Sequence, residues 1–306
     1  MTDPHRLLIL REVARAGSFA RAAAQLRQTP SAISQQIAAL ERSVGIAVVH
    51  RSTRGVTLTE AGRVLVATAD AIQAELQTAI RHVAELRLHG PRALIVVTFP
   101  SAGEPLLAPA LSALTRSDET REHPVDITVT EAEPDEALTA LRNGDADLAL
   151  VYHFHTPEPP AEWRHAAGPA TYVRLVDEEL RLLVPADHSL ADRESISLAE
   201  VAGERWIHAW GDTGNLIDTL AAAHGFRPEV ACRSSDYRFM SALVGAGVGV
   251  ALVPALALTE RPDVTALALS PQPVRYVGAY LPTGHRRNRT AEALLSILRA
   301  ETAERA

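Results

Sequence analysis

The stretch SFARAAAQLRQTPSAISQQIAAL, residues 18–40, decides the fold of the first part of this chain. It begins with Ser18, a residue type that caps helices, and its apolar side chains then recur at helical spacing. A very short turn at Arg27 and Gln28 ends this helix. Thr29 is a second cap residue, and Pro30 takes the first position of the next helix, where proline is tolerated. The stretch therefore predicts two helices joined by a tight turn.

The second of these helices has an apolar face and a polar face. Ile33 and Ile37 share one side, and the opposite side carries Ser31, Gln35 and Arg42. An ordinary solvated face is the alternative, but such a face usually carries several charges, and this one is nearly uncharged up to residue 40. Glutamine can bond both N6 and N7 of adenine. We therefore interpret the pair as a helix-turn-helix whose second helix lies in a DNA groove.

Residues 48–58, VVHRSTRGVTL, predict a β-hairpin next to the helices. Two β-prone runs flank a polar turn that contains Gly55, and Arg51 and Arg54 lie in or beside that turn. There the guanidinium groups can reach phosphates or a minor groove. An apolar helical stripe over residues 7–14 precedes the pair and stops at Gly17. Helix, helix-turn-helix and hairpin in this order predict a winged helix.

The charge of the chain changes sign after the predicted winged helix. Residues 1–65 hold nine arginines and four acidic residues, whereas the whole chain has a net charge of −7, so the remainder is acidic. A basic head on an acidic body indicates a polyanion-binding module. The chain has no lysine, so the head must make its cationic contacts through arginine, which is permanently charged and can bind phosphate in a forked geometry.

Three motifs in the head resemble the N-terminal signature of the LysR-type transcriptional regulators. They are AGSFARAAAQL at 16–26, SAISQQIAALE at 31–41 and RSTRGVTLTEAG at 51–62. The family commonly has Gln-Pro where this chain has Pro30-Ser31, and often Arg where it has Gln35. These departures bear on the operator sequence and not on the mode of docking. The candidate DNA-binding residues are Ser18, Thr29, Pro30, Ser31, Ser34, Gln35, Gln36, Arg42, Arg51 and Arg54.

A long helix is predicted from Thr59 to the Gly90-Pro91 stop. Apolar residues recur along it at alternating spacings of four and three, which is typical of two helices packed side by side. The alternative is a helix packed on its own domain, which usually has a slightly wider apolar stripe. We interpret the stripe as a dimer seam, as in the linker helix of the LysR-type family, because two joined heads can read a dyad operator. The predicted seam consists of Leu65, Ala69, Ile72, Leu76, Ala79, Val83 and Leu86.

Residues 91–306 alternate predicted strands and helices, which is typical of an α/β fold with helices on both sides of the sheets. Their pattern, including GDADLAL at 144–150, is similar to the effector domain of the LysR-type family. The resemblance implies the two-lobed fold of periplasmic solute-binding proteins, with a small inducer between the lobes. We expect a winged helix-turn-helix domain (1–58), a linker helix (59–90) and an effector-binding domain (91–306). Lobe I would comprise about 91–170 and 267–306, and lobe II about 171–266.

Polar residues gather where several predicted strands end, and open α/β sheets bind ligands at such ends. Backbone N–H groups and a serine hydroxyl after the first strand of the body could hold an anion. Aromatic and titratable side chains lie at the ends of later strands. We therefore predict that a small effector binds there, and the hydrogen-bond donors suit an anionic effector. A cap or turn role is the alternative for each residue taken singly. The candidates are Ser101, Ala102, Gly103, Tyr152, His153, Trp210, Gly211, Asp212, Ser234 and Ser235.

Nothing in the sequence indicates catalysis. It lacks a Gly-x-Ser-x-Gly elbow, a Walker loop and a His-Glu-x-x-His motif. Cys232, the single cysteine, excludes an internal disulfide and a cysteine zinc cluster. We expect no cofactor and no metal. The absence of a long apolar run favours the cytoplasm over a membrane.

The predicted function is that of a bacterial LysR-type regulator that binds double-stranded DNA and a small effector. The resemblance implies a dimer of dimers, and contact with RNA polymerase is a further expectation. Two other classes stay open. One is a solute-sensing protein whose basic head binds another protein. A gel shift with DNA would distinguish this protein from a regulator. The other is an α/β enzyme with an attached DNA-binding domain, which would turn over a bound metabolite.

Overall fold

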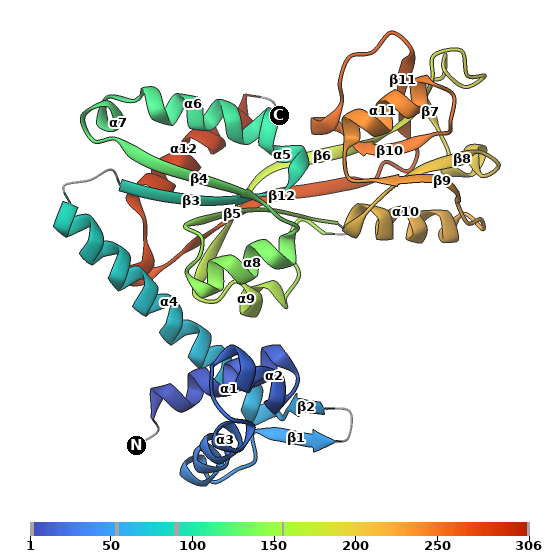
Figure 1. Cartoon of the computed structure of the whole chain (residues 1–306). Helices are drawn as coiled ribbons and strands as arrows, with labels where there is room; N and C mark the ends of the chain where they lie inside the picture. Colours follow the sequence, from blue (N-terminus) through green and yellow to red (C-terminus); the bar gives the residue numbers. More distant parts are fainter. Residues whose placement is uncertain (1–2, 53–54, 89–91, 155, 305–306) are drawn as a thin grey trace. The chain divides into compact units, whose positions relative to one another are not determined.

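The computed structural model describes residues 3–52, 55–88, 92–154 and 156–304 (Figure 1). Residues 1–90, with the short segments 142–145 and 284–286, form one compact unit, and the remaining residues form a second. The described elements of the first unit are α1 (Pro4–Ala16), α2 (Phe19–Gln25), α3 (Pro30–Val44), β1 (Val49–Ser52), β2 (Gly55–Leu58) and α4 (Glu60–Leu88).

Local capping explains where the first helices begin and end. The side chains of Ser18 and Thr29 each accept a hydrogen bond, at 3.2 Å, from the backbone N–H three residues later. Gly17 ends α1 with a φ of 65°, in the left-handed region that glycine adopts at low cost. The predicted caps are therefore confirmed. Arg27, in the turn between α2 and α3, also has a positive φ, 54°.

The winged helix is held together by one apolar core. Strands β1 and β2 pair as an antiparallel hairpin, from Val49 opposite Leu58 to Ser52 opposite Gly55. Side chains from α1, α2, α3, β1 and α4 meet inside, with their burial following the predicted helical spacing. The fully buried core side chains include Leu10, Val13, Ala22, Ile33, Ile37, Leu40 and Ala69.

The first half of α4 belongs to this core, which corrects the prediction of a continuous dimer seam. Ala69 is buried in the core, and Leu65 and Ile72 pack against it. In addition, Arg11 Nε of α1 donates to Asp70 Oδ1 of α4 at 2.7 Å, and both side chains are buried. The alternative of a helix packed on its own domain is therefore right for this half, because α1 covers the stripe.

Further along α4 the apolar stripe is uncovered within the chain. The side chains of Leu76 and Ile80 are 52% and 61% exposed, and Ala79 is exposed as well. The side chains of Val83 and Leu86, the last two predicted seam positions, lie outside the described residues. The dimer seam stays a prediction for this second half.

The second unit is built on an eight-stranded sheet with the order β4-β3-β5-β12-β6-β11-β7, in which β10 also pairs with β6. A separate pair of parallel strands, β8 and β9, accompanies it. The strands are β3 (Arg92–Thr98), β4 (Val125–Glu131), β5 (Leu148–His153), β6 (Ala170–Pro185), β7 (Ser195–Ile196), β8 (Arg205–Ala209), β9 (Glu229–Ser234), β10 (Ala251–Pro254), β11 (Val264–Leu269) and β12 (Val274–Pro282).

Helices cover both faces of the first part of this sheet (Figure 1). Alternate residues of β3 and β5 point to opposite faces, so Val96 and Leu150 pack with α6 and α12, whereas Val97 and Val151 pack with α8 and α9. The helices are α5 (Pro100–Ala102), α6 (Ala108–Arg116), α7 (Asp118–Glu122), α8 (Pro134–Asn143), α9 (Trp163–Ala166), α10 (Gly211–Ala223), α11 (Tyr237–Gly245) and α12 (Arg289–Ala303). A π-helical turn, Gly103–Leu107, joins α5 to α6.

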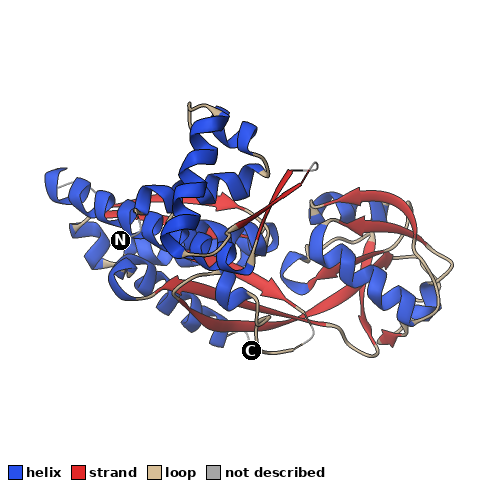
Figure 2. Ribbon diagram, turned by 90° about the horizontal axis from the view of Figure 1, so that it is seen from below, coloured by secondary structure: helices blue, strands red, loops and turns tan. Residues whose placement is uncertain are grey.

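Two long strands connect the lobes of this unit (Figures 1 and 2). Strand β6 has 16 residues; its first part pairs with β12, from Ala170 opposite Pro282 to Glu179 opposite Val274, and its second part pairs with β10 and β11. One sheet therefore runs through both lobes.

Candidate functional site: a nucleic-acid interface and a ligand cavity

The exposed face of α3 is polar and uncharged over its first two turns. Ser31 and Gln35 are exposed on the side opposite the buried Ile33 and Ile37. The hydroxyls of Thr29 and Ser31 lie 3.1 Å apart in a mutual hydrogen bond. Because the Gln35 amide has no intramolecular hydrogen bond among the described residues, both its donor and its acceptor are free for a base edge.

Two arginines flank this face. Arg51 Nη1 of β1 donates to Ser34 Oγ of α3 at 3.1 Å, and its guanidinium lies 4.9 Å from the centre of the Phe19 ring. These contacts hold the Arg51 charge beside α3. Arg6 Nε of α1 donates to Gln36 Oε1 at 3.2 Å, so α1 also fixes one amide of α3. The sequence reasoning had not singled out Arg6 or Phe19, because both lie outside the helix-turn-helix pair or on its apolar side.

The other predicted DNA-binding residues have simpler surroundings. Pro30 and Arg42 are exposed, and Ser18 is occupied as a cap, since its Oγ accepts from both the N–H and the Nε of Arg21. Arg54 lies outside the described residues. Among the described residues, the candidate interface therefore consists of the exposed face of α3 with Arg51 at its side.

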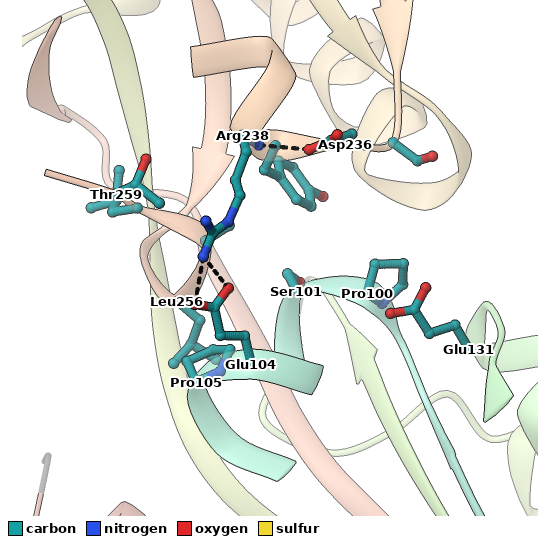
Figure 3. A pocket seen from close by; sticks show the side chains of 13 residues that line it. Pro100, Ser101, Glu104, Pro105, Glu131, Asp236, Arg238, Leu256 and Thr259 are labelled. Atoms are coloured by element: carbon teal, nitrogen blue, oxygen red, sulfur yellow. Dashed lines mark hydrogen bonds and ion pairs between the residues drawn. The ribbon is translucent and has the colours of Figure 1, made fainter. Parts of the chain in front are cut away.

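The second unit contains a cavity of about 550 Å³ between its lobes (Figure 3). One wall comes from α5, the π-helical turn and the end of β4, and the other comes from the start of α11 and the segment 256–259. The mouth carries four charged side chains, and prolines and leucines form an apolar part of the wall. The lining residues are Pro100, Ser101, Glu104, Pro105, Glu131, Ser235, Asp236, Tyr237, Arg238, Leu256, Ala257, Leu258 and Thr259.

A smaller pit of about 10 Å³ adjoins this cavity and shares Pro100, Ser101, Ser235 and Tyr237 with it. Its volume is about that of one water-sized probe. Its further walls are aromatic and charged. They consist of Phe99, Glu133, Tyr152, Ala209, Trp210 and Arg275.

Arg275 is the buried cation of the pit. Its Nε donates to Glu178 Oε2 at 2.7 Å, its Nη2 donates to Ser101 Oγ at 3.0 Å, and the side chain is fully buried. The guanidinium lies between two rings, 5.0 Å from the centre of Phe99 and 4.7 Å from that of Tyr152. Glu178 Oε1 accepts from the backbone N–H of Leu256 at 2.6 Å. Among the described residues, only Nη1 of this guanidinium has no hydrogen-bond partner.

Two tyrosines in the pit stay neutral at physiological pH. Burial, and then the hydrogen bond to Glu133, raise the pKa of Tyr152, whose hydroxyl donates to Glu133 Oε2 at 2.6 Å. Burial also raises the pKa of Tyr237, against the lowering effect of Arg275. The hydroxyl of Tyr152 therefore remains a donor to the Glu133 carboxylate.

One ion pair joins the two lobes at the mouth. The Arg238 guanidinium of α11 contacts both carboxylate oxygens of Glu104 in the π-helical turn, and both side chains are largely exposed (Figure 3). Asp236, also at the mouth, is the N-cap of α11, because it accepts from the backbone N–H groups of Arg238 and Phe239. In the first turn of α10, burial and then the neighbouring Asp135 raise the pKa of Asp212.

The structure brings together part of the predicted effector set. Ser101, Tyr152, Trp210 and Ser235 line the pit. The others line neither cavity: Ala102 is buried, Gly103 starts the π-helical turn, Gly211 and Asp212 start α10, and Ser234 Oγ accepts from the backbone N–H of Asp236.

His153 corrects the prediction most clearly. As the neighbour of Tyr152 on β5, it points to the opposite face of the sheet. There it is buried, stacks on Tyr276, packs against Trp163 and lies 3.2 Å from the Tyr172 hydroxyl. Residues that follow one another at the end of a strand cannot both face one cleft, and this rule was available from the sequence.

The sequence reasoning missed the charged residues of the site. Glu133 follows β4, Arg238 lies in α11 and Arg275 is the second residue of β12. A charged residue inside an apolar strand was a signal for Arg275, since a buried guanidinium needs a partner. The expectation of an anionic effector also rests on the serine and N–H groups alone, whereas the cavity and pit contain more carboxylates than guanidiniums.

The described residues contain neither a helix with the length and apolar character of a bilayer span nor a cluster of His, Cys, Asp and Glu that could hold a metal ion.

Comparison with known proteins covers both units. Residues 4–63 match the bacterial regulatory helix-turn-helix protein of the lysR family, and residues 89–303 match the LysR substrate binding domain. The HTH-type transcriptional regulator YnfL of Escherichia coli (strain K12) is 30% identical, covering 78% of this chain and 77% of its own. YybE of Bacillus subtilis (strain 168) is 28% identical, covering 87% of both chains. These relatives are named as transcriptional regulators, not as enzymes, as the sequence predicted.

Solved structures share the fold. A full-length OxyR variant from Pseudomonas aeruginosa superposes with a TM-score of 0.57 at 22% identity, covering 98% of both chains. Full-length CbnR complexed with its target DNA gives a TM-score of 0.51 at 22% identity, covering 98% of this chain and 100% of that one. With a winged helix-turn-helix, a long helix and a two-lobed α/β body, and with family matches over both units, this chain belongs to the LysR family of bacterial helix-turn-helix transcriptional regulators.

Proposed function

We propose that this regulator binds a dyad operator in double-stranded DNA as a dimer or dimer of dimers, and that a small effector in the cavity of residues 91–306 controls it. Residues 1–58 would read DNA, and the second half of the helix over 59–90 would join protomers. The protein would act in the cytoplasm, in contact with RNA polymerase. The observation that carries the proposal is the exposed, uncharged face of α3 with Arg51 fixed beside it. CbnR, which has the same fold, was solved in complex with its target DNA, and this supports DNA binding by the present chain.

In this proposal α3 lies in the major groove. Ser31 and Gln35 contact base edges, while Arg51 contacts a phosphate or the adjacent minor groove. One head makes few contacts, so specificity requires two heads at a fixed spacing. The exposed Leu76 and Ile80 of α4 supply an apolar surface for pairing two protomers.

The effector would act by changing the relative stability of two arrangements of the lobes. Each lobe contributes one wall of the cavity, and the strands β6 and β12 run through both lobes. A ligand that contacts both walls favours the arrangement in which the two walls fit it. It can shift the equilibrium only by its difference in affinity for the two arrangements.

The test is a binding titration of the full chain with duplex DNA from the region upstream of its own gene, with a scrambled duplex of equal length as the control. Footprinting should show two protected half-sites related by a dyad, and sedimentation should show an even number of protomers on each duplex. Equal affinity for the scrambled duplex, or one protomer per site, would reject the proposal.

A further inference from the structure

The charges that line the cavity leave a surplus of carboxylates. Two guanidiniums are present, and both are already paired: Arg238 with Glu104 at the mouth and Arg275 with Glu178 behind the pit. Glu131 in the cavity and Glu133 in the pit form no ion pair within the described part of the chain. A ligand that carries only negative charge would meet like charges here, so the site favours a ligand that brings a cation.

The pit also lacks one hydrogen-bond acceptor. Arg275 is fully buried, and the Nη1 atom of its guanidinium has no partner among the described residues. A buried N–H group without an acceptor destabilises the protein, and more so when the group is charged. A ligand acceptor next to Nη1 would remove this cost. A carboxylate satisfies this requirement best, because its hydrogen bonds to a guanidinium are charge-assisted.

The carboxylate that favours a cation and the guanidinium that lacks an acceptor lie in the same pit. Glu133 and Arg275 line one pit, on either side of Tyr152: Tyr152 donates to Glu133, and its ring lies 4.7 Å from the Arg275 guanidinium. An anion-binding and a cation-binding group so close together match a molecule whose ammonium and carboxylate are one carbon apart. The adjoining cavity of about 550 Å³ has an apolar wall with Pro105, Leu256 and Leu258, which suits a side chain.

From this arrangement we propose that the effector is a free α-amino acid, bound with its carboxylate at Arg275 Nη1 and Ser101, its ammonium at Glu133, and its side chain in the larger cavity. This inference rests on the proposed function, since it names the ligand class of that same site.

The pit must widen to admit such a head group, because about 10 Å³ holds no more than one water. Trp210 is the wall residue that can move at least cost. Its side chain is 58% exposed, and it lies over Arg233 at 5.6 Å rather than in the core. Phe99, Tyr152 and Arg275 are buried, so moving them would disturb the packed core.

The experiment is a calorimetric titration of the full chain with each of the twenty standard L-amino acids and ornithine. For each amino acid that binds, the matched des-amino acid (carboxylate only) and decarboxylated amine (ammonium only) are titrated as well. We expect at least one amino acid to bind and both analogues to lose tenfold or more in affinity. No binding by any amino acid, or equal binding by either analogue, would overturn the inference.

A variant pair locates the ammonium. Glu133→Gln keeps an acceptor for Tyr152 but removes the charge, and should lower amino-acid affinity about tenfold while leaving the affinity of the des-amino analogue unchanged or higher. Glu136→Gln, an exposed change on α8 outside the cavity lining, is the matched control and should bind like the parent. If both variants bind the amino acid like the parent, Glu133 does not hold the ammonium and the inference fails.

The failure of this inference can be distinguished from the failure of the proposed function. The same preparations are titrated with duplex DNA from the upstream region. Specific DNA binding with no binding of any amino acid would leave the regulator function in place and reject only the ligand class. Loss of specific DNA binding would reject the proposed function instead.

Discussion

Arg275 and Glu178 face each other as register partners on β12 and β6, and their charged groups are sealed from solvent at the junction of the two lobes. The pair contributes to the walls of the ligand site on both sides. Arg275 reaches Ser101 in the first lobe, and Glu178 accepts from the backbone of Leu256 in the second. Removing one partner would leave a buried charge without compensation.

Arg275→Met should therefore lower the free energy of unfolding by about 3–5 kcal/mol. The double variant Arg275→Met with Glu178→Leu should recover much of this loss, because no charge is left buried. Urea unfolding of the full chain, followed by circular dichroism, measures both. Arg174→Ala, which breaks an exposed pair with Asp177, is the control and should cost no more than about 1 kcal/mol. A double variant as unstable as the single one would contradict this account.

Gln35→Ala should reduce operator affinity by about 1–3 kcal/mol at one base position, because its free amide is placed to bond a base edge. Fluorescence anisotropy on a set of singly substituted duplexes measures the effect. Gln25→Ala, an exposed glutamine of α2, is the matched control. If Gln35→Ala weakens binding equally on every duplex, the residue does not read a base.

Arg51→Ala should weaken binding on all duplexes by a similar factor. Since Ser34 and Phe19 hold its guanidinium beside α3, its loss removes one phosphate contact, and the slope of log affinity against log salt should fall by about 0.9. Titrations between low and moderate salt measure this slope. Arg121→Ala, in an exposed part of the second unit, should leave it unchanged.

Gly62→Ala should destabilise the winged helix by about 1–3 kcal/mol. A Cβ at this position of α4 would lie 2.0 Å from the carbonyl oxygen of Val48, so helix and hairpin would have to separate. Alanine is the better helix former by about 1 kcal/mol, so a net loss reports this contact. Thermal unfolding measures it, with Gly203→Ala, where a Cβ meets nothing, as the control. A gain in stability would show that the hairpin can move away from the added methyl group at little cost.

Arg238→Ala should speed amide exchange in the first turn of α11 while changing the free energy of unfolding by about 1 kcal/mol or less. The Glu104–Arg238 pair is exposed, so its contribution to stability is small, but it joins the two walls of the cavity. Hydrogen exchange followed by mass spectrometry checks this. At 1 M salt, where the pair is screened, the parent should approach the variant. Identical exchange in both proteins at low salt would contradict the prediction.

The head of this protein could be predicted from the sequence because its determinants are local. Ser18, Thr29 and Gly17 set the helix boundaries within a few residues of themselves, and the spacing of Ile33 and Ile37 fixes which side of α3 is exposed. The packing partner of the apolar stripe on α4 was harder to predict. A pattern of spacings shows that a helix packs against something, but it does not show whether the partner is α1 of the same chain or a second protomer.

The ligand site could be predicted only in part because its walls come from distant segments. Ser101 and Tyr152 were found because Ser101 follows β3 and Tyr152 lies near the end of the parallel strand β5, at the same edge of the sheet. Arg275 reaches the same place because β12 inserts antiparallel between β5 and β6, and sequence spacing carries no information about such an insertion. Glu133 follows β4, which runs parallel to β3, so the rule that found Ser101 could also have found Glu133. Arg238 lies on α11 in the other lobe, and nothing in the sequence placed that helix at the cavity.

The attachment of the first half of α4 to the winged helix has a mechanical consequence. With Ala69 inside the core and Asp70 bonded to Arg11, α4 cannot turn about its axis without carrying α3 along. A rotation of α4 about its axis would therefore also rotate the exposed face of α3.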